Sequence, residues 1–333
     1  MMYLLIFPYV VGSILKNVKV WKEFHILQLR MDKPNPVSSR EEARVHIVIP
    51  VYNEQAVINK AHEYFSSLNF SKEEAQVSFV QSAKELCHAP SQQTLAQITQ
   101  KNSRFQYIQC PKTGSKATQL NYYISNYTKD TDWVFIFDID SQVEAVKFRQ
   151  LLTLLPSLST EAIYQLPSNY LTKDPQNIWQ KIFAVQQTTF SLEEEIFNSI
   201  EAIWGNNYKY QSVIGHGLLI HREIYDKISG FPDPVEDTRL AFEAIKNNIP
   251  IKYLPFFDTG TVPNNLPDYV NQTSGWFFGQ SFIAKEIVSN WESFNIKQKS
   301  KYLYRIWLNI WWIGKSYFII GFTLYAIMIQ NYE

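Results

Sequence analysis

The middle of the chain alternates short apolar runs with segments whose apolar residues recur at helical spacing. Four short runs predict strands, at Val45–Ile49, Val77–Val80, Phe105–Ile108 and Trp133–Phe137. Helical spacing between them predicts helices over 56–68, around 95–98 and over 117–124. This alternation predicts an α/β fold with a parallel sheet core and helices on both faces. In such sheets a ligand binds beyond the carboxyl ends of the strands, so the residues that follow each strand are the first candidates for chemistry.

The two ends of the chain are apolar and differ from the middle. Trp307–Ile329 holds one charge, Lys315. At 1.5 Å per residue this run reaches about 35 Å, enough to cross a hydrocarbon core of about 30 Å. A buried core helix is the alternative, but the length and the Trp311–Trp312 pair favour a transmembrane helix. Met1–Leu15 covers only about 22 Å and contains Pro8, which indicates a shortened span or a segment in the membrane interface.

Basic residues flank both apolar ends on the side of the middle segment. Lys16, Lys19 and Lys22 follow the first run, and Lys297, Lys299, Lys301 and Arg305 precede the last one. Under the positive-inside rule this distribution predicts a protein of the cell membrane whose middle domain faces the cytoplasm. The predicted organisation is an apolar membrane segment over 1–15, a basic linker over 16–44, an α/β domain over 45–281, a basic connector over 282–305 and a transmembrane helix over 306–329.

Composition narrows the class of protein. Hydrophobic residues make up 46% of the 333 residues, which excludes a disordered chain. The 31 basic and 31 acidic residues cancel, so a nucleic-acid-binding protein with a basic face is excluded as well. Aromatic residues at 15% and only 11 glycines suit carbohydrate stacking or interfacial anchoring better than a glycine-rich cofactor fold. Cys87 and Cys110 have no metal-ligand spacing and indicate two reduced thiols.

Acidic residues follow two of the predicted strands. Asp138 and Asp140 come directly after the apolar run Trp133–Phe137, and Glu54 follows the first strand. Two carboxylates one residue apart repel each other unless a cation neutralises them, and carboxylate oxygens suit Mg²⁺ or Mn²⁺ completed by phosphate oxygens of a substrate. A lone Asp-x-Asp is often a solvated turn, but the preceding apolar strand favours the metal interpretation.

Three further motifs lie between and after these strands. Gly114–Asn121 is a glycine turn opening a helix, with Lys116 in its first turn, and such a helix start can hold an anion. Gly215-His216-Gly217 interrupts an apolar stretch. Glu236 and Asp237 stand in the first turn of a predicted helix, where acids also occur simply because they stabilise the helix dipole.

In chain order, the motifs at 50–54, 114–121, 138–140, 215–217 and 236–237 resemble those of the family 2 glycosyltransferases. These inverting enzymes have the GT-A nucleotide-sugar-binding fold and include cellulose and hyaluronan synthases. The resemblance runs from about Val45 to Gly279, and the apolar ends are similar to those of the membrane-bound bacterial-type branch. It implies that the domain over 45–281 moves a sugar from a nucleotide-sugar donor, UDP-linked, to a glycan or lipid-linked acceptor in cell-surface polysaccharide or glycolipid synthesis.

The resemblance also implies roles for individual residues. Pro50, Tyr52, Glu54 and Lys116 would line the donor pocket, with Glu85 in place of the acids that usually read the base. Asp138 would contact the ribose or the metal, and Asp140 would bind Mn²⁺ or Mg²⁺. Asp237 would be the catalytic base. The acceptor side would comprise Gly215, His216, Gly217, Glu236, Gln272 and Trp276.

Two departures from the family pattern keep alternatives open. Gln272–Trp276 is similar to the Gln-x-x-Arg-Trp motif of the processive synthases, but Gly275 replaces the arginine, which argues against processive polymerisation. After the second strand, Ser82–Glu85 lacks the usual acidic residues. A catalytically inactive relative acting as a membrane scaffold or partner subunit is therefore the alternative from another class. A nucleotidyltransferase would need a basic loop after the first strand, where Pro50–Glu54 has none.

Overall fold

The computed structural model describes residues 44–52, 54–83, 89–101, 103–129, 132–170, 175–192 and 212–308, together with a few isolated positions in both terminal segments. The predicted membrane segment over 1–15 and nearly all of the predicted span over 306–329 lie outside these residues, and so do Glu85 and most of the 16–44 linker. Among the described residues, no helix has the length and apolar character needed to cross a membrane.

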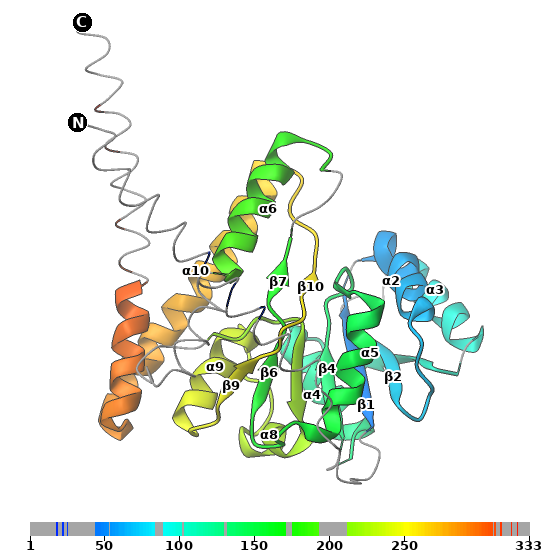
Figure 1. Cartoon of the computed structure of the whole chain (residues 1–333), viewed down its shortest axis with the longest axis horizontal. Coiled ribbons are helices and arrows are strands. Elements are labelled where there is room, and N and C mark those ends of the chain that lie inside the picture. The colour runs from blue at the N-terminus through cyan, green and yellow to red at the C-terminus, as the bar shows by residue number, and fades with distance from the viewer. Residues whose placement is uncertain are drawn as a thin grey trace, which may run out of the picture.

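Two sheets organise the described residues (Figure 1). The larger sheet has seven strands in the order β3-β2-β1-β4-β8-β6-β9. Its strands are β1 (Val45–Val51), β2 (Ala75–Ser82), β3 (Phe105–Cys110), β4 (Trp133–Ile136), β6 (Ile163–Gln165), β8 (Leu218–His221) and β9 (Ile251–Tyr253). The smaller sheet has the order β5-β10-β7, formed by β5 (Gln142–Val143), β10 (Asp258–Thr259) and β7 (Ser168–Asn169).

The larger sheet is parallel except for β8. β1 pairs in parallel with β2 and β4, and β2 with β3, whereas β8 runs antiparallel to both β4 and β6. The predicted α/β fold with a parallel core is therefore confirmed, with one reversed strand. Because β1 and β4 are neighbours, the residues that follow them meet at one edge of the sheet.

The first strand is longer than the sequence pattern predicts. β1 continues through Pro50 to Val51, although proline is unfavourable inside a paired strand. The carbonyl of Val48 accepts a hydrogen bond from Phe137 N at 3.1 Å, just past the end of β4. Pro50 lies two residues further along, so its nitrogen faces the same side beyond the paired part of β4. Proline at this position has no N–H to donate to Phe137 O, so the pairing of β1 with β4 ends here.

Helices cover both faces of the larger sheet. The helices are α2 (Gln55–Ser67), α3 (Ala89–Lys101), α4 (Lys116–Tyr127), α5 (Ala145–Leu154), α6 (Ile178–Phe190), α8 (Arg222–Lys227), α9 (Glu236–Lys246) and α10 (Leu266–Ser289), and a further helix runs over 296–308. Short 3-10 turns lie at Leu155–Ser157 and Trp291–Ser293.

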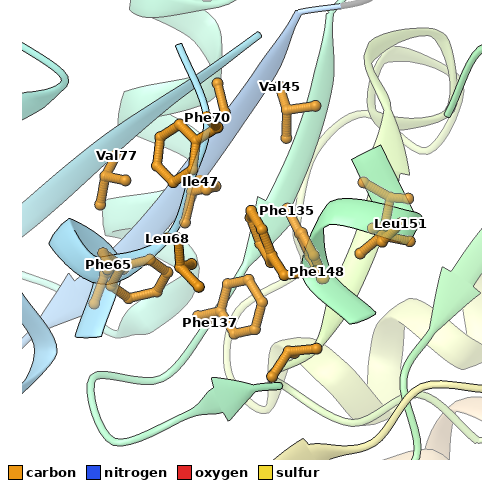
Figure 2. Close-up of a cluster of buried hydrophobic side chains, with 14 of the residues drawn as sticks. Val45, Ile47, Phe65, Leu68, Phe70, Val77, Phe135, Phe137, Phe148 and Leu151 are labelled. Atoms are coloured by element: carbon orange, nitrogen blue, oxygen red, sulfur yellow. The ribbon is translucent and has the colours of Figure 1, made fainter. Parts of the chain in front are cut away.

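Alternating residues of each strand serve two separate apolar cores. On one face, Ile47 and Phe135 pack with Phe65 of α2 and Phe148 of α5 (Figure 2). On the other face, Val48 and its neighbours pack against α4, α8, α9 and the inner side of α10. Truncating a large side chain in such a core costs about 2–5 kcal/mol. These two cores hold the strand ends, and thus the site, in place.

Candidate active site

The residues after β1 place one carboxyl group at the edge of the sheet. Pro50 is buried, Tyr52 is exposed, and Glu54 precedes α2. The Glu54 carboxylate accepts a hydrogen bond from Tyr52 N at 3.2 Å. Burial raises the pKa of Glu54 to about 7, and the nearby charges of Asp138 and Asp140 act in the same direction. The carboxyl groups after the two strands are therefore close enough to influence one another.

Lys116 connects three parts of the site. Its ammonium forms an ion pair with Asp138 and donates to the carbonyl of Gly215 at 2.6 Å. A Cβ placed on Gly215 would lie 3.2 Å from Glu236 Oε1 and 3.3 Å from Lys116 Nζ. Lys116 therefore joins the end of β4 to the 215–217 turn and to the start of α9. Desolvation acts to raise the pKa of Asp138, but Lys116 and His216 outweigh it and hold that pKa below its usual value.

Asp140 turns toward the segment between β10 and α10. Its Oδ2 accepts hydrogen bonds from the backbone N–H of Thr261, at 2.9 Å, and from the Thr261 hydroxyl. Asp138, Asp140 and Thr261 border a cleft of about 300 Å³. The other lining residues are Ser141, Tyr170, His216, Gly260, Val262, Pro263 and Gln272. The two strand-end aspartates thus line a cavity.

His216 lies in this cleft and is held from two sides. Its Nδ1 is 2.7 Å from Oδ2 of the fully buried Asp258, and its Nε2 is 3.1 Å from the hydroxyl of Tyr170. Burial lowers the pKa of His216, but the Asp258 carboxylate outweighs burial and raises that pKa to about 9. His216 is therefore a fixed imidazolium at neutral pH.

The 215–217 turn needs glycine for steric reasons. Gly217 has φ of +61°, and a Cβ there would lie 2.9 Å from Asp258 Oδ2 and 3.1 Å from Leu166 Cβ. Gln165 donates to the carbonyl of His216 at 2.7 Å and thereby fixes the turn against β6. Gly215 and Gly217 thus serve close packing around His216.

The two acids of α9 occupy its first turn, as the sequence predicts. The Asp237 carboxylate accepts from Thr238 N at 2.6 Å and from Thr238 Oγ1 at 3.1 Å, while Glu236 extends toward Lys116. Burial raises the pKa of Glu236 to about 7; Lys116 acts to lower it, and Asp237 adds to the increase. Both acids lie beside Gly215, near the strand-end carboxylates.

Gln272 and Trp276 lie one turn apart on α10, Gln272 at the cleft and Trp276 with 40% of its surface exposed. Gln272 lines the cleft and accepts from Gln187 of α6 at 2.7 Å. Trp276 follows one helical turn later on the same face. Gly275, which replaces the arginine of the processive motif, lies on the exposed part of α10, and a Cβ added there would meet no atom within 4 Å.

Sequence reasoning missed four residues that shape the site. Tyr170, Asp258 and Thr261 bind His216 or Asp140 directly. Asn121 of α4 accepts from Phe231 N at 2.7 Å and donates to Phe231 O at 2.8 Å, which fixes the segment before α9. For these residues the sequence offers one signal, Asp258, which interrupts the apolar pair Phe256–Phe257. A single acid in such a position does not by itself identify a site.

The acidic groups of the cleft fit a divalent ion of a particular kind. Within the described residues, no group of three or more histidine, cysteine, aspartate or glutamate side chains has the arrangement of a metal site. The described residues therefore do not form a site in which protein side chains alone surround a metal ion. One or two carboxylates completed by phosphate oxygens and water is the usual arrangement for Mg²⁺, and Asp138 and Asp140 at the cleft match it.

Taken together, the fold and the site define a class: an α/β protein with an acidic ligand cleft at the carboxyl ends of its parallel strands. The profile of Glycosyl transferase family group 2 matches residues 133–331. The chain belongs to this family, and the resemblance inferred from its motifs is confirmed.

Comparison with other proteins adds two structural neighbours. A search of curated protein sequences found no match. The mannosyltransferase PcManGT from Pyrobaculum calidifontis, solved in complex with GDP-Man and Mn²⁺, has 16% identity and a TM-score of 0.48; the match covers 80% of this chain and 70% of that chain. S. aureus TarS, residues 1–349 in complex with UDP-GlcNAc, has 13% identity and a TM-score of 0.45; the match covers 66% of this chain and 59% of that chain.

Proposed function

We propose that this protein is a membrane-anchored, metal-dependent inverting glycosyltransferase. It moves a sugar from a nucleotide-sugar donor to a glycan or lipid-linked acceptor in cell-surface polysaccharide or glycolipid synthesis. The family membership supports glycosyl transfer. A UDP-linked sugar is the first donor to test.

One observation carries the proposal. Lys116 contacts both Asp138 and the Gly215 carbonyl, and it lies beside Glu236. Lys116 thus lies between Asp138, which lines the cleft, and the acids at the start of α9. A catalytic base has to lie within reach of the acceptor hydroxyl while the donor is bound. Acids on both sides of Lys116 support such an arrangement.

The chemistry follows from these positions. Asp237 takes the proton of an acceptor hydroxyl, whose oxygen then bonds to the anomeric carbon of the donor from the face opposite the diphosphate. The bond between the anomeric carbon and the diphosphate oxygen breaks, and the nucleoside diphosphate leaves. Held by Asp140 and Asp138, a bound Mn²⁺ or Mg²⁺ would supply Lewis-acid neutralisation of the diphosphate charge. Lys116, paired with Asp138, and His216, paired with Asp258, are the cations beside these acids.

The test is donor binding and turnover by the purified full-length chain. Thermal shift against UDP- and GDP-linked sugars, with Mg²⁺ or Mn²⁺, should identify a donor because a ligand that binds the folded state raises the melting temperature. Release of nucleoside diphosphate with that donor should follow. If no donor shifts the melting temperature or is turned over, the inactive scaffold becomes the better interpretation.

Membrane anchoring and orientation are part of the proposal. The basic flanks of the apolar ends support a catalytic domain on the cytoplasmic face of the cell membrane. A reporter domain fused after Glu333 should then be accessible from outside the cell. A reporter that stays protected would contradict a span over 306–329.

A further inference from the structure

The outer face of α6 is apolar and uncovered. Ile178, Ile182 and Val185 recur at the spacing of one helical face and are between 48% and 61% exposed. The opposite face carries Phe183 and Gln187, which are buried against α10. An ordinary surface helix exposes polar side chains to solvent, whereas α6 exposes mainly these branched apolar ones.

The N-terminal half of α10 has the same character. Leu266, Val270 and Phe277 lie on the face opposite Gln272 and are between 41% and 50% exposed, and Phe278 beside them is also exposed. This position separates Phe277 from the cleft, which Gln272 borders from the opposite face of α10.

The two helices form one projecting unit, which we call the α6–α10 prong (residues 178–190 and 266–284). They run in parallel: the rings of Phe183 and Tyr269 stack with centroids 4.0 Å apart, and Gln187 bonds Gln272 further along. Figure 1 shows the pair projecting from the sheet, with α10 behind α6. Since the inner faces meet, the apolar faces point away from each other.

Apolar side chains on both sides of a projection restrict what can cover it. A folded protein partner has one docking surface and would bury one side, whereas lipid surrounds an inserted element. Lys181 and Asp268 are the charged residues of the two stretches. At the tip, the helix caps are satisfied internally: Asn177 accepts from Gln180 N and Asn265 from Asp268 N, both at 2.9 Å. Polar backbone groups satisfied in this way are a requirement for contact with lipid.

The C-terminal part of the chain indicates where a bilayer would lie. Helix 296–308 ends toward the same side of the molecule, the top of the view in Figure 1, to which the prong projects. Leu303 and Trp307 on this helix are exposed, and the apolar run Trp307–Ile329 follows. A bilayer entered by this run would therefore lie on the side of the prong. Arg305 lies near the end of this helix, just before the run, and suits anionic headgroups.

We propose that the α6–α10 prong docks in the interface of a lipid bilayer and brings the cleft to an acceptor carried on a lipid. With 13 residues, α6 is about 20 Å long, too short to span, so the prong enters only the headgroup and upper acyl region. Gln272 lies on its inner face and lines the cleft, so an acceptor sugar attached to a membrane lipid would meet the cleft there. The acceptor part of this inference rests on the proposed glycosyl transfer; the docking part does not.

Docking is tested with a fluorophore on the full-length chain in vesicles of phosphatidylcholine and phosphatidylglycerol. Ile182→Cys and Phe277→Cys, each in a Cys87→Ser background, report on the two sides of the prong, and Cys110 is buried. Val146→Cys on α5 is the matched control, because Val146 is equally apolar and 62% exposed. Fluorescence at Ile182 and Phe277, but not at Val146, should be quenched by lipids spin-labelled near the headgroup. Equal quenching at all three positions, or no quenching at Ile182 and Phe277, would overturn the docking.

A second arm tests the lipid-borne acceptor separately. Nucleoside diphosphate release is measured with dodecyl glycosides in the vesicles and with the corresponding methyl glycosides in solution. Dodecyl glycosides should stimulate release at least several-fold more, and the Ile182→Ser/Phe277→Ser variant should lose this preference while retaining the reaction with methyl glycosides. Equal stimulation by both would refute the lipid acceptor even where quenching is seen. If the parent releases no nucleoside diphosphate with any donor, the proposed function fails, and the quenching result still decides the docking.

Discussion

Replacing Asp237 by asparagine separates a catalytic role from a structural one. The Asp237 carboxylate lies in the first turn of α9 and accepts from Thr238 N at 2.6 Å, and the amide oxygen of asparagine can accept the same bond. Asparagine cannot take the proton of an acceptor hydroxyl. The substitution therefore preserves this hydrogen bond and removes the carboxylate that we propose as the base.

The expected magnitudes differ enough to decide between the roles. A general base contributes about 10²–10⁴-fold to rate. Loss of the hydrogen bond to Thr238 N would cost about 1 kcal/mol of stability. Asp237→Asn should therefore lower sugar transfer by at least about 100-fold, with the donor dissociation constant and the melting temperature almost unchanged.

The matched control is Glu236→Gln, one residue earlier. Glu236 has a pKa of about 7 and extends toward Lys116, so its loss should alter the pH dependence of transfer near neutrality without abolishing transfer. Single-turnover transfer and donor titration are measured for both variants and the parent. If Glu236→Gln loses the activity and Asp237→Asn keeps it, Glu236 is the base and our assignment is wrong.

Three further changes test other parts of the site. Asp140→Asn should abolish the metal-dependent part of donor binding, measured by calorimetry with and without EDTA; unchanged metal-dependent affinity would exclude Asp140 as a ligand. Gly217→Ala should destabilise the fold by about 1–2 kcal/mol, because φ is positive there and Asp258 is in the way, whereas Gly275→Ala in the open part of α10 should stabilise by about 0.5–1 kcal/mol. Between pH 7 and 9, His216 keeps its proton in the folded chain but has lost it in the unfolded chain, where the pKa of histidine is 6.5. The free energy of unfolding should therefore fall with rising pH, by up to about 1.4 kcal/mol per pH unit. Asp258→Asn should flatten this slope in urea titrations; an unchanged slope would contradict the ion pair.

The sequence predicts the parts of the site that depend on local pattern. Asp138 and Asp140 follow an apolar strand, and their position beside a cleft follows from the parallel sheet. Glu236 and Asp237 open a helix, as the preceding Phe231–Pro234 turn indicates. Such residues can be found because a strand or helix boundary fixes where their side chains lie.

The residues that sequence reasoning missed depend on contacts between distant segments. Asp258 meets His216 across 42 positions, and Asn121 meets Phe231 across 110. Lys116 was predicted to lie near a bound nucleotide, and in this structure its ammonium is paired with Asp138. No local pattern contains these pairings, because they result from the packing of α4, β8 and β10 around the same edge of the sheet. The metal, donor and acceptor roles of the site residues remain predictions.

The balance of charge around the cleft leads to a last prediction, on pH and metal together. The acids near the cleft are Glu54, Asp138, Asp140, Glu236, Asp237 and Asp258, against the cations Lys116 and His216. A donor diphosphate would add further negative charge, so a divalent ion is needed most when all of these acids are ionised. Glu54 and Glu236 have pKa values of about 7, so both are largely protonated at pH 6 and ionised at pH 8, while His216, with a pKa of about 9, stays charged at both.

Donor binding without metal should therefore be tighter at pH 6 than at pH 8, and the gain in affinity on adding Mg²⁺ or Mn²⁺ should be larger at pH 8. The measurement is the donor dissociation constant at both pH values, with metal and with EDTA. A Glu54→Gln/Glu236→Gln variant should show the pH 6 behaviour at pH 8, because it lacks the two groups that titrate in this range. If the parent shows the same metal dependence at both pH values, these two carboxyl groups do not control the charge that the donor meets.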